Sequence, residues 1–444
     1  MEFVVKIEKL SNLGFGIARI DSQVVFVEGA CPGDEVKIEI TQKHRNFSHA
    51  RITEIITPSV HRVKPVCAMQ KVCGACRLQF IDYNYQLELK RQIVQDAMRT
   101  IGNLDIEIPA PVPSPQIFGY RRKIQYPVSE TKVSKRLLAG YYKPQSHEIV
   151  NIKHCPIQPA ICDDIIDFIR NKAPDFGISG YNERKHSGDL RHIVIRSSAS
   201  EGANLVTLAV NATKPFQRLK DFARAVFDEF REVSGVCVNF NSKKTNVIMG
   251  AKTECLAGKN FVEEKILGKT FKIGANTFFQ VNPESAENIF AYVRDYIRQN
   301  FNAPVVLDAY AGISSFGICV SDVCKKVVSV EENADSCDFA RAAAPDNPEI
   351  HNMDVSEFFA KEKRKFDVII VDPPRKGCTQ QSLDEACRLL KPKGRIIYVS
   401  CNPATLARDL KYLTGKGAKV ESIQPFDMFC HTYHIENAAV ISVH

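Results

Sequence analysis

The sequence contains no long hydrophobic run. No stretch of its 444 residues approaches the roughly eighteen consecutive apolar residues of a membrane-spanning helix. The first residues, MEFVVKIEKL, alternate apolar and charged side chains and lack the apolar segment of a secretion signal. Together these absences predict a cytoplasmic protein with no membrane partner.

Internal repeats and low-complexity tracts are also absent. Hydrophobic residues make up 44% of the chain and charged residues 25%, which are ordinary values for a soluble protein and exclude wholesale disorder. The length of 444 residues is about three times that of a typical domain, so two to four folded units are expected.

One block of the chain carries almost all of the net charge of +8. Residues 61–155 hold 15 Lys and Arg against 7 Asp and Glu, whereas residues 1–60 hold 7 against 8 and residues 156–444 hold 37 against 36. A local basic field suits a polyanion, because phosphate contacts supply most non-specific affinity for nucleic acids. A solvated cationic face explains the same charges equally well at this point.

Residues 1–57 alternate apolar and polar side chains in short runs that are separated by turn residues. Gly14, Gly16, Pro32 and Gly33 supply the turns, and this spacing predicts a small β-barrel. The Gly-Phe-Gly and Cys-Pro-Gly-Asp turns resemble those of the TRAM domain, an OB-like barrel that binds RNA.

Residues 58–265 are predicted to form a central α+β domain. A loop that carries cysteines comes first, and an amphipathic helix follows that is expected to end at Gly102 as a glycine cap. Strand-like runs then alternate with helical stretches at 162–172 and 214–232.

The pattern changes at about residue 266. The runs VVLDAY, KKVVSVE, FDVIIVDPP, RIIYVS and AAVISV are hydrophobic strands separated by helical stretches. This predicts an α/β domain over residues 266–444, doubly wound and Rossmann-like, with a parallel sheet covered on both faces. Such a domain binds its ligand at the carboxyl ends of the strands.

Three cysteines lie close together in the run CAMQKVCGACRLQF. Cys67, Cys73 and Cys76 have the spacing C-x5-C-x2-C, and Cys155 in KHCPIQ is a candidate fourth ligand. Clustered cysteines in a reducing compartment more often bind a metal than form disulfides. The set predicts a site for zinc or for an iron-sulfur cluster. Radical enzymes that use adenosylmethionine need a C-x3-C-x2-C run, which is absent.

A strand, a turn of small residues, a helix and a second strand form a candidate nucleoside site. Asp308 ends the first strand, and Tyr310, Gly312 and Ser315 lie in the turn that opens the helix. Small side chains and the free N–H groups of a helix start let a ligand approach the backbone. Glu331 ends the next strand, where a carboxylate can accept hydrogen bonds from both ribose hydroxyls.

Two further acidic residues follow later strands. Asp354 comes after the third strand, where a carboxylate often faces an adenine amino group, and Asp372 ends the fourth strand in the run DPPR. Two prolines stiffen the backbone, so the Asp372 side chain is expected to be held over the edge of the sheet. A related motif in amino-group methyltransferases is Asn-Pro-Pro-aromatic, in which the amide binds an exocyclic amine. Asp372 and Arg375 in its place favour a substrate other than an amine, which is compatible with methylation of a carbon.

Cys401 lies at the tip of the next strand, and Glu436 lies just before the last one. The dipole of the helix that follows Cys401 is expected to lower the pKa of its thiol. A thiolate that adds to C6 of uracil makes C5 nucleophilic, and a carboxylate must then remove the C5 proton. Cys401 and Glu436 are candidates for these two roles. A small buried residue and a solvated rim residue are the plain structural alternatives.

Six motifs occur in a fixed order: FFQVNPES, the turn from Asp308 to Ser315, Glu331, DPPRKG, SCNPATLARD and HTYHIE. Over essentially the whole chain they resemble the RNA uridine-5-carbon methyltransferases. The TRAM-like start and the four cysteines resemble the branch that acts on large-subunit ribosomal RNA and holds a 4Fe-4S cluster. The transfer-RNA branch generally lacks both features.

The resemblance implies S-adenosyl-L-methionine as methyl donor and a 4Fe-4S cluster as second cofactor. The residues it assigns to the donor are Gln280, Tyr310, Ser315, Glu331, Asp354 and Asp372. It makes Cys401 the nucleophile, Glu436 the proton acceptor, and Cys67, Cys73, Cys76 and Cys155 the cluster ligands. The chain departs from the family at Ser314, where glycine is usual, at Ser315, where an amide is common, and at Cys430, where proline is usual.

The segment YRRKIQYPV also matches the family and is expected to contact RNA, whose target base must flip out to reach Cys401. These inferences predict a monomeric enzyme of the EC 2.1.1 class that makes 5-methyluridine in 23S ribosomal RNA. The same reaction on transfer RNA is the nearest alternative. An iron-sulfur RNA-binding assembly factor without catalysis is an alternative of another class.

Overall fold

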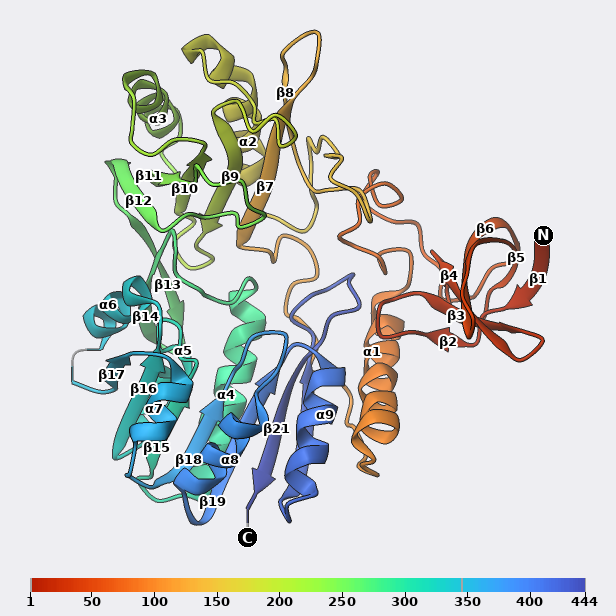
Figure 1. Cartoon of the computed structure of the whole chain (residues 1–444), viewed down its shortest axis with the longest axis vertical. Coiled ribbons are helices and arrows are strands. Elements are labelled where there is room, and N and C mark those ends of the chain that lie inside the picture. The colour runs from red at the N-terminus through yellow and green to blue at the C-terminus, as the bar shows by residue number, and fades with distance from the viewer. Residues whose placement is uncertain (1, 345, 444) are drawn as a thin grey trace.

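The computed structural model describes residues 2–344 and 346–443 (Figure 1). In this part of the chain the strands form three sheets of six, six and seven strands and one two-stranded ribbon. None of the described helices is long and apolar enough to cross a membrane.

The first sheet encloses a small core within residues 2–57. In the spatial order β1-β5-β6-β4-β3-β2, its strands are β1 (Glu2–Lys6), β5 (Glu35–Lys43), β6 (Phe47–Thr57), β4 (Gln23–Glu28), β3 (Gly16–Ile20) and β2 (Lys9–Leu10). Alternate residues point inward, so Val25 and Val27 on β4 and Val36 and Ile38 on β5 are buried. The period of two in the sequence is therefore the reason for this core.

A long helix follows the cysteine-bearing loop. α1 (Tyr83–Ala97) begins after Asp82, whose carboxylate accepts the N–H groups of Asn84 and Tyr85. It continues into a π-helical turn (Met98–Gly102), and the residue with a left-handed backbone is Asn103 rather than the expected Gly102. The apolar face of α1 shares a core with α9 (Pro403–Thr414). Leu89 and Ile93 of α1 belong to a further small core, and residues 58–265 thus contribute to four hydrophobic cores.

The second sheet organises the middle of the chain. In the order β12-β11-β10-β9-β7-β8, its strands are β12 (Lys252–Gly258), β11 (Val233–Phe240), β10 (Asn204–Val210), β9 (Leu190–Ser197), β7 (Lys123–Glu130) and β8 (Leu137–Ala139). The helices that pack on it are α2 (Ala160–Lys172) and α3 (Gln217–Glu229). A short 3-10 helix (Ala173–Phe176) follows α2. The ribbon of β13 (Phe261–Ile266) and β14 (Lys269–Gly274) leads onward.

The third sheet has helices on both faces. In the order β17-β16-β15-β18-β19-β21-β20, its strands are β17 (Glu349–Asn352), β16 (Lys326–Glu331), β15 (Val305–Ala309), β18 (Phe366–Val371), β19 (Leu390–Ser400), β21 (Glu436–Ser442) and β20 (Lys419–Phe426). The first five run parallel, and β21 runs antiparallel to its neighbours.

Two helices, α4 (Pro283–Asn300) and α5 (Ser315–Val320), share a core on one face of this sheet. On the other face lie α7 (Val355–Lys361), α8 (Gln380–Leu389) and α9, joined by α1. α6 (Ala334–Ala343) contacts β14 and β17, and a 3-10 turn (Ser321–Val323) follows α5. The predicted doubly wound domain is therefore confirmed. Its strand order reverses between β15 and β18, which opens a crevice at their carboxyl ends.

Candidate functional site

A cavity of about 870 Å³ lies at the carboxyl ends of the parallel strands. Its size is in the range of small-molecule and cofactor sites. Seven of the eight predicted catalytic and donor-binding residues line it: Gln280, Tyr310, Glu331, Asp354, Asp372, Cys401 and Glu436. Ser315, the first residue of α5, is not among the lining residues.

The turn after β15 presents a backbone surface to the cavity. Gly312 lines the cavity with a left-handed φ of 57°, and its N–H donates to Oε2 of Glu331 at 2.9 Å. The N–H of Asn333 donates to Oε1 of the same carboxylate at 2.8 Å. These bonds fix Glu331 at the end of β16. Each carboxylate oxygen keeps a lone pair that can accept a hydroxyl from a ligand.

Ser314, which stands where glycine is usual in the family, makes its contacts in the protein interior and not in the cavity. Ser314 is fully buried with a φ of 58°, and its Oγ lies 2.7 Å from Oγ of Ser329 on β16. This hydrogen bond offsets part of the cost of a left-handed backbone in a residue with a Cβ. An ideal Cβ on Gly317 would lie 2.4 Å from the Ser314 Oγ, so the hydroxyl pair requires glycine there.

Asp308 supports the same turn from below. Its Oδ2 accepts the N–H of Gly317 at 2.9 Å, whereas Oδ1 is buried without a partner among the described residues. Burial raises the pKa of Asp308 to about 8. Asp308 does not line the cavity. It therefore holds the start of α5 in place.

Asp354 and Gln280 are positioned by different elements. Asp354 is the N-cap of α7, and its Oδ1 accepts the N–H groups of Ser356 and Glu357, which leaves Oδ2 free for a ligand. Gln280 precedes α4, and its Nε2 lies 3.5 Å from Oδ2 of Asp372. Both side chains line the cavity.

The loop 372–378 after β18, which carries Asp372 and Arg375, is held by α9. The N–H of Cys378 donates to Oδ2 of Asp409 at 3.0 Å, and the Tyr398 hydroxyl donates to the same oxygen at 2.8 Å. Nη2 of Arg408 donates to the carbonyl of Lys376 at 3.0 Å. Arg408 and Asp409 are functional supports that the sequence reasoning missed, although both belong to the motif SCNPATLARD.

Cys401 is half-buried at the tip of β19, next to Asn402, the N-cap of α9. The expectation of a lowered thiol pKa is wrong. Burial, followed by the negative charge of Glu436, raises the pKa of Cys401 to about 12, although Arg375 acts in the opposite direction. The direction of the shift is therefore that of the desolvated thiol and the nearby carboxylate.

Glu436 is buried at the first residue of β21, opposite Phe426 of β20. Burial and then the charge of Asp372 raise the pKa of Glu436 well above its usual range. Burial raises the pKa of Asp372 in the same way. Two carboxyl groups that line one cavity and repel each other when ionised hold a proton more firmly than an isolated one, because ionising both is costly. Such a pair can exchange a proton with a substrate.

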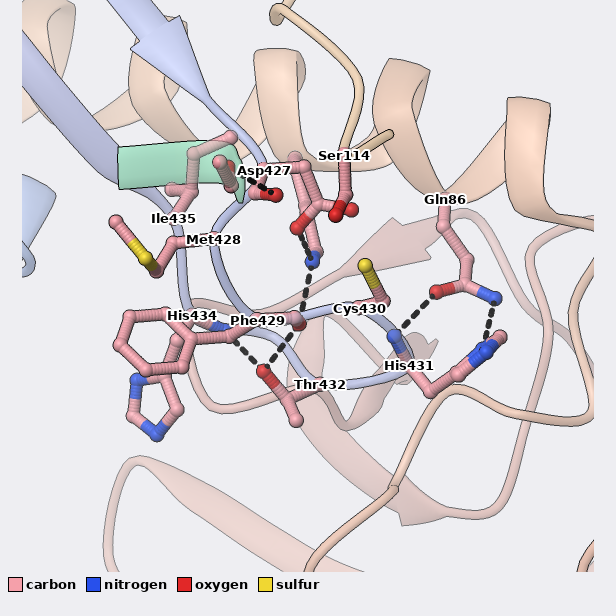
Figure 2. Close-up of polar contacts among 12 residues, drawn as sticks. Gln86, Ser114, Asp427, Met428, Phe429, Cys430, His431, Thr432, His434 and Ile435 are labelled. Atoms are coloured by element: carbon pink, nitrogen blue, oxygen red, sulfur yellow. Dashed lines mark hydrogen bonds and ion pairs between the residues drawn. The ribbon is translucent and has the colours of Figure 1, made fainter. Parts of the chain in front are cut away.

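The segment 427–435 that leads to Glu436 is anchored on α1 (Figure 2). Nζ of Lys90 lies 2.7 Å from Oδ1 of Asp427 and 3.0 Å from the carbonyl of Phe429, and both charged side chains are fully buried. Oε1 of Gln86 accepts the N–H of His431 at 3.0 Å. The sequence reasoning missed both residues of α1, because their partners lie more than three hundred positions away.

The far part of the same segment faces the cavity. Thr432 donates its hydroxyl to the carbonyl of Phe429 at 2.8 Å and accepts the N–H of His434 at 3.2 Å (Figure 2). Phe429, Thr432 and His434 line the cavity. Burial lowers the pKa of His434 to about 4, so this imidazole is neutral at physiological pH. A neutral ring can accept or donate a hydrogen bond to a base.

The four predicted cysteine ligands line one small second cavity. Cys67, Cys73 and Cys76 reach it from one loop, and Cys155 reaches it from the segment before α2. Burial and the neighbouring cysteines raise the pKa of Cys76. Within residues 2–344 and 346–443, no three His, Cys, Asp or Glu side chains converge closely enough to hold a single metal ion.

Cations also reach the large cavity. Arg77, Arg121, Arg375 and Lys376 line it, and Arg121 belongs to the predicted RNA-contacting segment. Nε of Arg121 is buried and has no hydrogen-bond partner among the described residues, and its guanidinium lies 6.0 Å from the centre of the Tyr141 ring. An unpaired buried donor of this kind is costly unless a ligand satisfies it.

Two family models match the chain. Residues 359–443 match the model "tRNA (Uracil-5-)-methyltransferase", and residues 2–53 match the TRAM domain. Proteins described as uncharacterized RNA methyltransferases are similar over almost their full lengths. That of Clostridium tetani is 35% identical, with 98% of this chain and 94% of the relative covered. That of Listeria monocytogenes strain EGD-e is 36% identical, with 98% and 96% covered.

A solved structure is similar over the whole chain. The crystal structure of Pyrococcus abyssi tRNA (uracil-54, C5)-methyltransferase in complex with S-adenosyl-L-homocysteine superposes with a TM-score of 0.79. Its sequence is 27% identical, and the match covers 99% of both chains.

Proposed function

The chain belongs to the S-adenosylmethionine-dependent RNA uracil-5-methyltransferase family with an N-terminal TRAM domain, and on that premise we propose that it methylates C5 of a uridine in 23S ribosomal RNA through a covalent Cys401 adduct. One observation carries the proposal. A single cavity is lined by the Cys401 thiol, by the carboxyl groups of Asp372 and Glu436, and by the Glu331 carboxylate that suits a ribose. The family predicted from the sequence is the one that the relatives support.

The donor would occupy the part of the cavity nearest β15 to β17. Glu331 would accept hydrogen bonds from ribose hydroxyls, Asp354 would accept one from an adenine amino group, and Gln280 and Tyr310 would line the remaining walls. S-adenosylmethionine supplies an electrophilic methyl group when bound. Because Ser315 does not line the cavity, we assign the backbone contact of this turn to Gly312 instead.

Cys401 and Glu436 would act in turn on the uracil ring. The Cys401 thiolate, stabilised by Arg375, forms a bond from Sγ to C6, and the electrons of the C5–C6 double bond move toward C5 and O4. Once C5 carries the methyl group, the Glu436 carboxylate takes the C5 proton. The electrons of the C5–H bond restore the double bond, and Sγ leaves as thiolate. Asp372 would orient the edge of the base.

The four cysteines support a proposal of a 4Fe-4S cluster as a structural cofactor. They are thiols that line one cavity, which is the donor set such a cluster requires. Zinc is the alternative metal, because two thiolates separated by two residues suit it equally well. Anaerobic purification followed by iron and zinc assays and an absorbance spectrum distinguishes the two. One zinc per chain and no iron would overturn the cluster assignment.

Ribosomal RNA is the substrate that the TRAM domain and the four cysteines favour by family resemblance. Transfer RNA is the second candidate, because the Pyrococcus abyssi protein of similar fold is named as a tRNA uracil-54 methyltransferase. Incubation of the purified protein with transcripts of large-subunit ribosomal RNA and of transfer RNA, followed by mapping of 5-methyluridine, decides between them. Methylation of transfer RNA alone would overturn the ribosomal assignment.

Two variants test the chemistry. Cys401→Ala is expected to abolish methyl transfer and any RNA adduct that survives denaturation, whereas Glu436→Gln is expected to retain the adduct. Cys387→Ala, at another half-buried thiol on α8, is the matched control and should behave as the wild type. If Cys401→Ala still makes 5-methyluridine at the wild-type rate, the covalent mechanism is wrong. Free release of RNA by Glu436→Gln would exclude its role as base.

A further inference from the structure

One end of the second sheet carries a concentration of cations far from the cavity. Three loops meet at this end: 131–136 between β7 and β8, 182–187 before β9, and 242–247 after β11. Figure 1 shows the β7–β8 hairpin loop at the end of the sheet that is farthest from the third sheet. We call these three loops the distal basic end. Their exposed cations are Lys132, Lys135, Arg136, Arg184, Lys185, Lys243 and Lys244.

The topology brings these loops together from separate parts of the chain. The Nε2 atom of His186 lies 3.0 Å from the Ser242 carbonyl. Nη1 of Arg191, at the start of β9, donates to the carbonyls of Asn241 at 2.6 Å and Lys243 at 2.7 Å. A Cβ on Gly180 would lie 2.5 Å from the backbone of Ser129 on β7. The segment before β9 therefore packs directly against β7. These contacts hold the loops that carry the cations in fixed positions.

Few acidic side chains neutralise the cations of the distal basic end. Among the described residues, six of the seven cations form no ion pair, and Lys135 alone pairs with a carboxylate, that of Glu130. Glu183 is the acidic residue of the three loops, and it pairs with His147. Like charges crowded in this way repel one another, and an anionic ligand relieves the repulsion.

The composition of the loops also identifies the kind of contact. Apart from His186, no aromatic side chain belongs to the three loops, so they offer no platform for stacked bases. Lysines and arginines that are not interleaved with aromatic residues in their loops contact phosphates, which position a nucleic acid without reading its sequence. The distal basic end therefore suits an RNA backbone rather than an unstacked loop.

The distance from the cavity limits which RNA can use both sites. The N–H of Arg122, just before β7, donates to the carbonyl of Val281, which lines the cavity. The distal loops lie at the other end of β7, which has eight residues. A strand of that length spans about 26 Å at about 3.3 Å per residue. A uridine with a few neighbours cannot bridge that span, whereas a structured RNA can.

We infer that the distal basic end binds the phosphate backbone of the same RNA whose uridine enters the cavity, and so selects long structured substrates. This inference rests on the proposed function. It assigns RNA binding to residues 184–185 and 243–244, which lie outside the basic block seen in the sequence.

The test removes one cation from each loop with the variant Lys132→Gln/Lys185→Gln/Lys244→Gln. The matched control, Lys363→Gln/Lys411→Gln/Lys419→Gln, removes three exposed lysines outside the cavity lining that form no ion pair among the described residues. Binding is measured from about 50 to 200 mM salt with two probes, a large-subunit ribosomal RNA transcript and a short oligouridylate.

For the long transcript, the distal variant is expected to bind about tenfold more weakly at low salt, and the slope of log K against log salt should fall by about 2 to 3. Oligouridylate binding by both variants, and transcript binding by the control, should stay within about twofold of wild type. Equal transcript binding and slopes for the two variants would overturn the inference. If the wild type methylates the transcript in that case, the proposed function stands; if it methylates no RNA, the proposed function itself fails.

Discussion

Burial raises the pKa of the Cys401 thiol, and two charged neighbours then shift it in opposite directions. Glu436 raises that pKa and Arg375 lowers it. In Glu436→Gln no negative charge can form at this position, so the thiolate fraction should rise at an alkaline pH at which Glu436 of the wild type is ionised. We expect iodoacetamide to alkylate Cys401 about threefold to tenfold faster in this variant at a fixed pH, since one pKa unit is a tenfold change in thiolate. Mass spectrometry of the Cys401 peptide measures the rate.

The opposite change provides the control for this prediction. Arg375→Gln should slow alkylation of Cys401, because the stabilising cation is removed. Cys387 on α8 serves as an internal reference in both variants. Equal rates at Cys401 in all three proteins would show that neither charge acts on the thiol.

Ser314 shows how a residue that departs from its family is accommodated. Ser329→Ala should destabilise the protein by about 1 to 2 kcal/mol, because the buried Ser314 hydroxyl loses its partner. Ser314→Gly removes both that hydroxyl and the left-handed strain. Ser329→Ala should therefore cost about 1 kcal/mol less in the Ser314→Gly background. Urea unfolding of the four proteins measures this coupling, and additive costs would contradict it.

At the scale of elements, α1 supports the segment that ends at Glu436. Lys90→Met leaves Asp427 charged, buried and unpaired, and should cost about 3 to 5 kcal/mol. The double variant Lys90→Met/Asp427→Leu should recover most of this loss, since replacing a buried ion pair by apolar groups is often neutral. Thermal and urea unfolding test the pair.

The rate at which the RNA adduct is released distinguishes an effect on the position of Glu436 from an effect on stability. The double variant should be as stable as the wild type but should hold Glu436 less firmly in position. The reason is that Lys90 also donates a hydrogen bond to the Phe429 carbonyl, which the double variant lacks. We expect its RNA adduct to be released more slowly than in the wild type at equal stability. Normal adduct release would limit the role of the ion pair to folding.

The strands and the residues at their ends could be predicted because both follow from local patterns. Glu331, Asp372 and Cys401 each end a hydrophobic run, and the ends of parallel strands meet at one edge of a sheet. The anchoring role of Lys90 could not be predicted, because its partner Asp427 lies 337 positions later. The pKa of Cys401 was mispredicted, because burial and the Glu436 charge depend on packing rather than on the neighbouring helix.

At the scale of the whole molecule, the large cavity is formed by several elements that lie outside the first sheet. Gly74, Arg77 and Arg121 reach it from the cysteine loop and the second sheet, while Cys401 and Glu436 reach it from the third. Tyr310, Glu331 and Asp354, which would bind the donor, lie at the ends of β15, β16 and β17, and Gln280 lies before α4. These elements differ from those that carry Arg77 and Arg121. RNA contacts and donor contacts should therefore be separable by mutation.

Arg121→Gln tests this separation. The unpaired buried Nε of Arg121 suits an RNA phosphate or base near the target uridine, so the variant should bind oligouridylate about tenfold more weakly. Its affinity for S-adenosylmethionine, measured by calorimetry, should stay within about twofold of wild type. Arg224→Gln, at an exposed arginine on α3 that pairs with Asp228, is the control and should change neither affinity.

A loss of both affinities in Arg121→Gln would mean that the substitution disrupts the whole cavity rather than the RNA site alone. Unchanged oligouridylate binding would remove Arg121 from the RNA site, in contrast to the distal basic end, whose loss should leave this short probe unaffected.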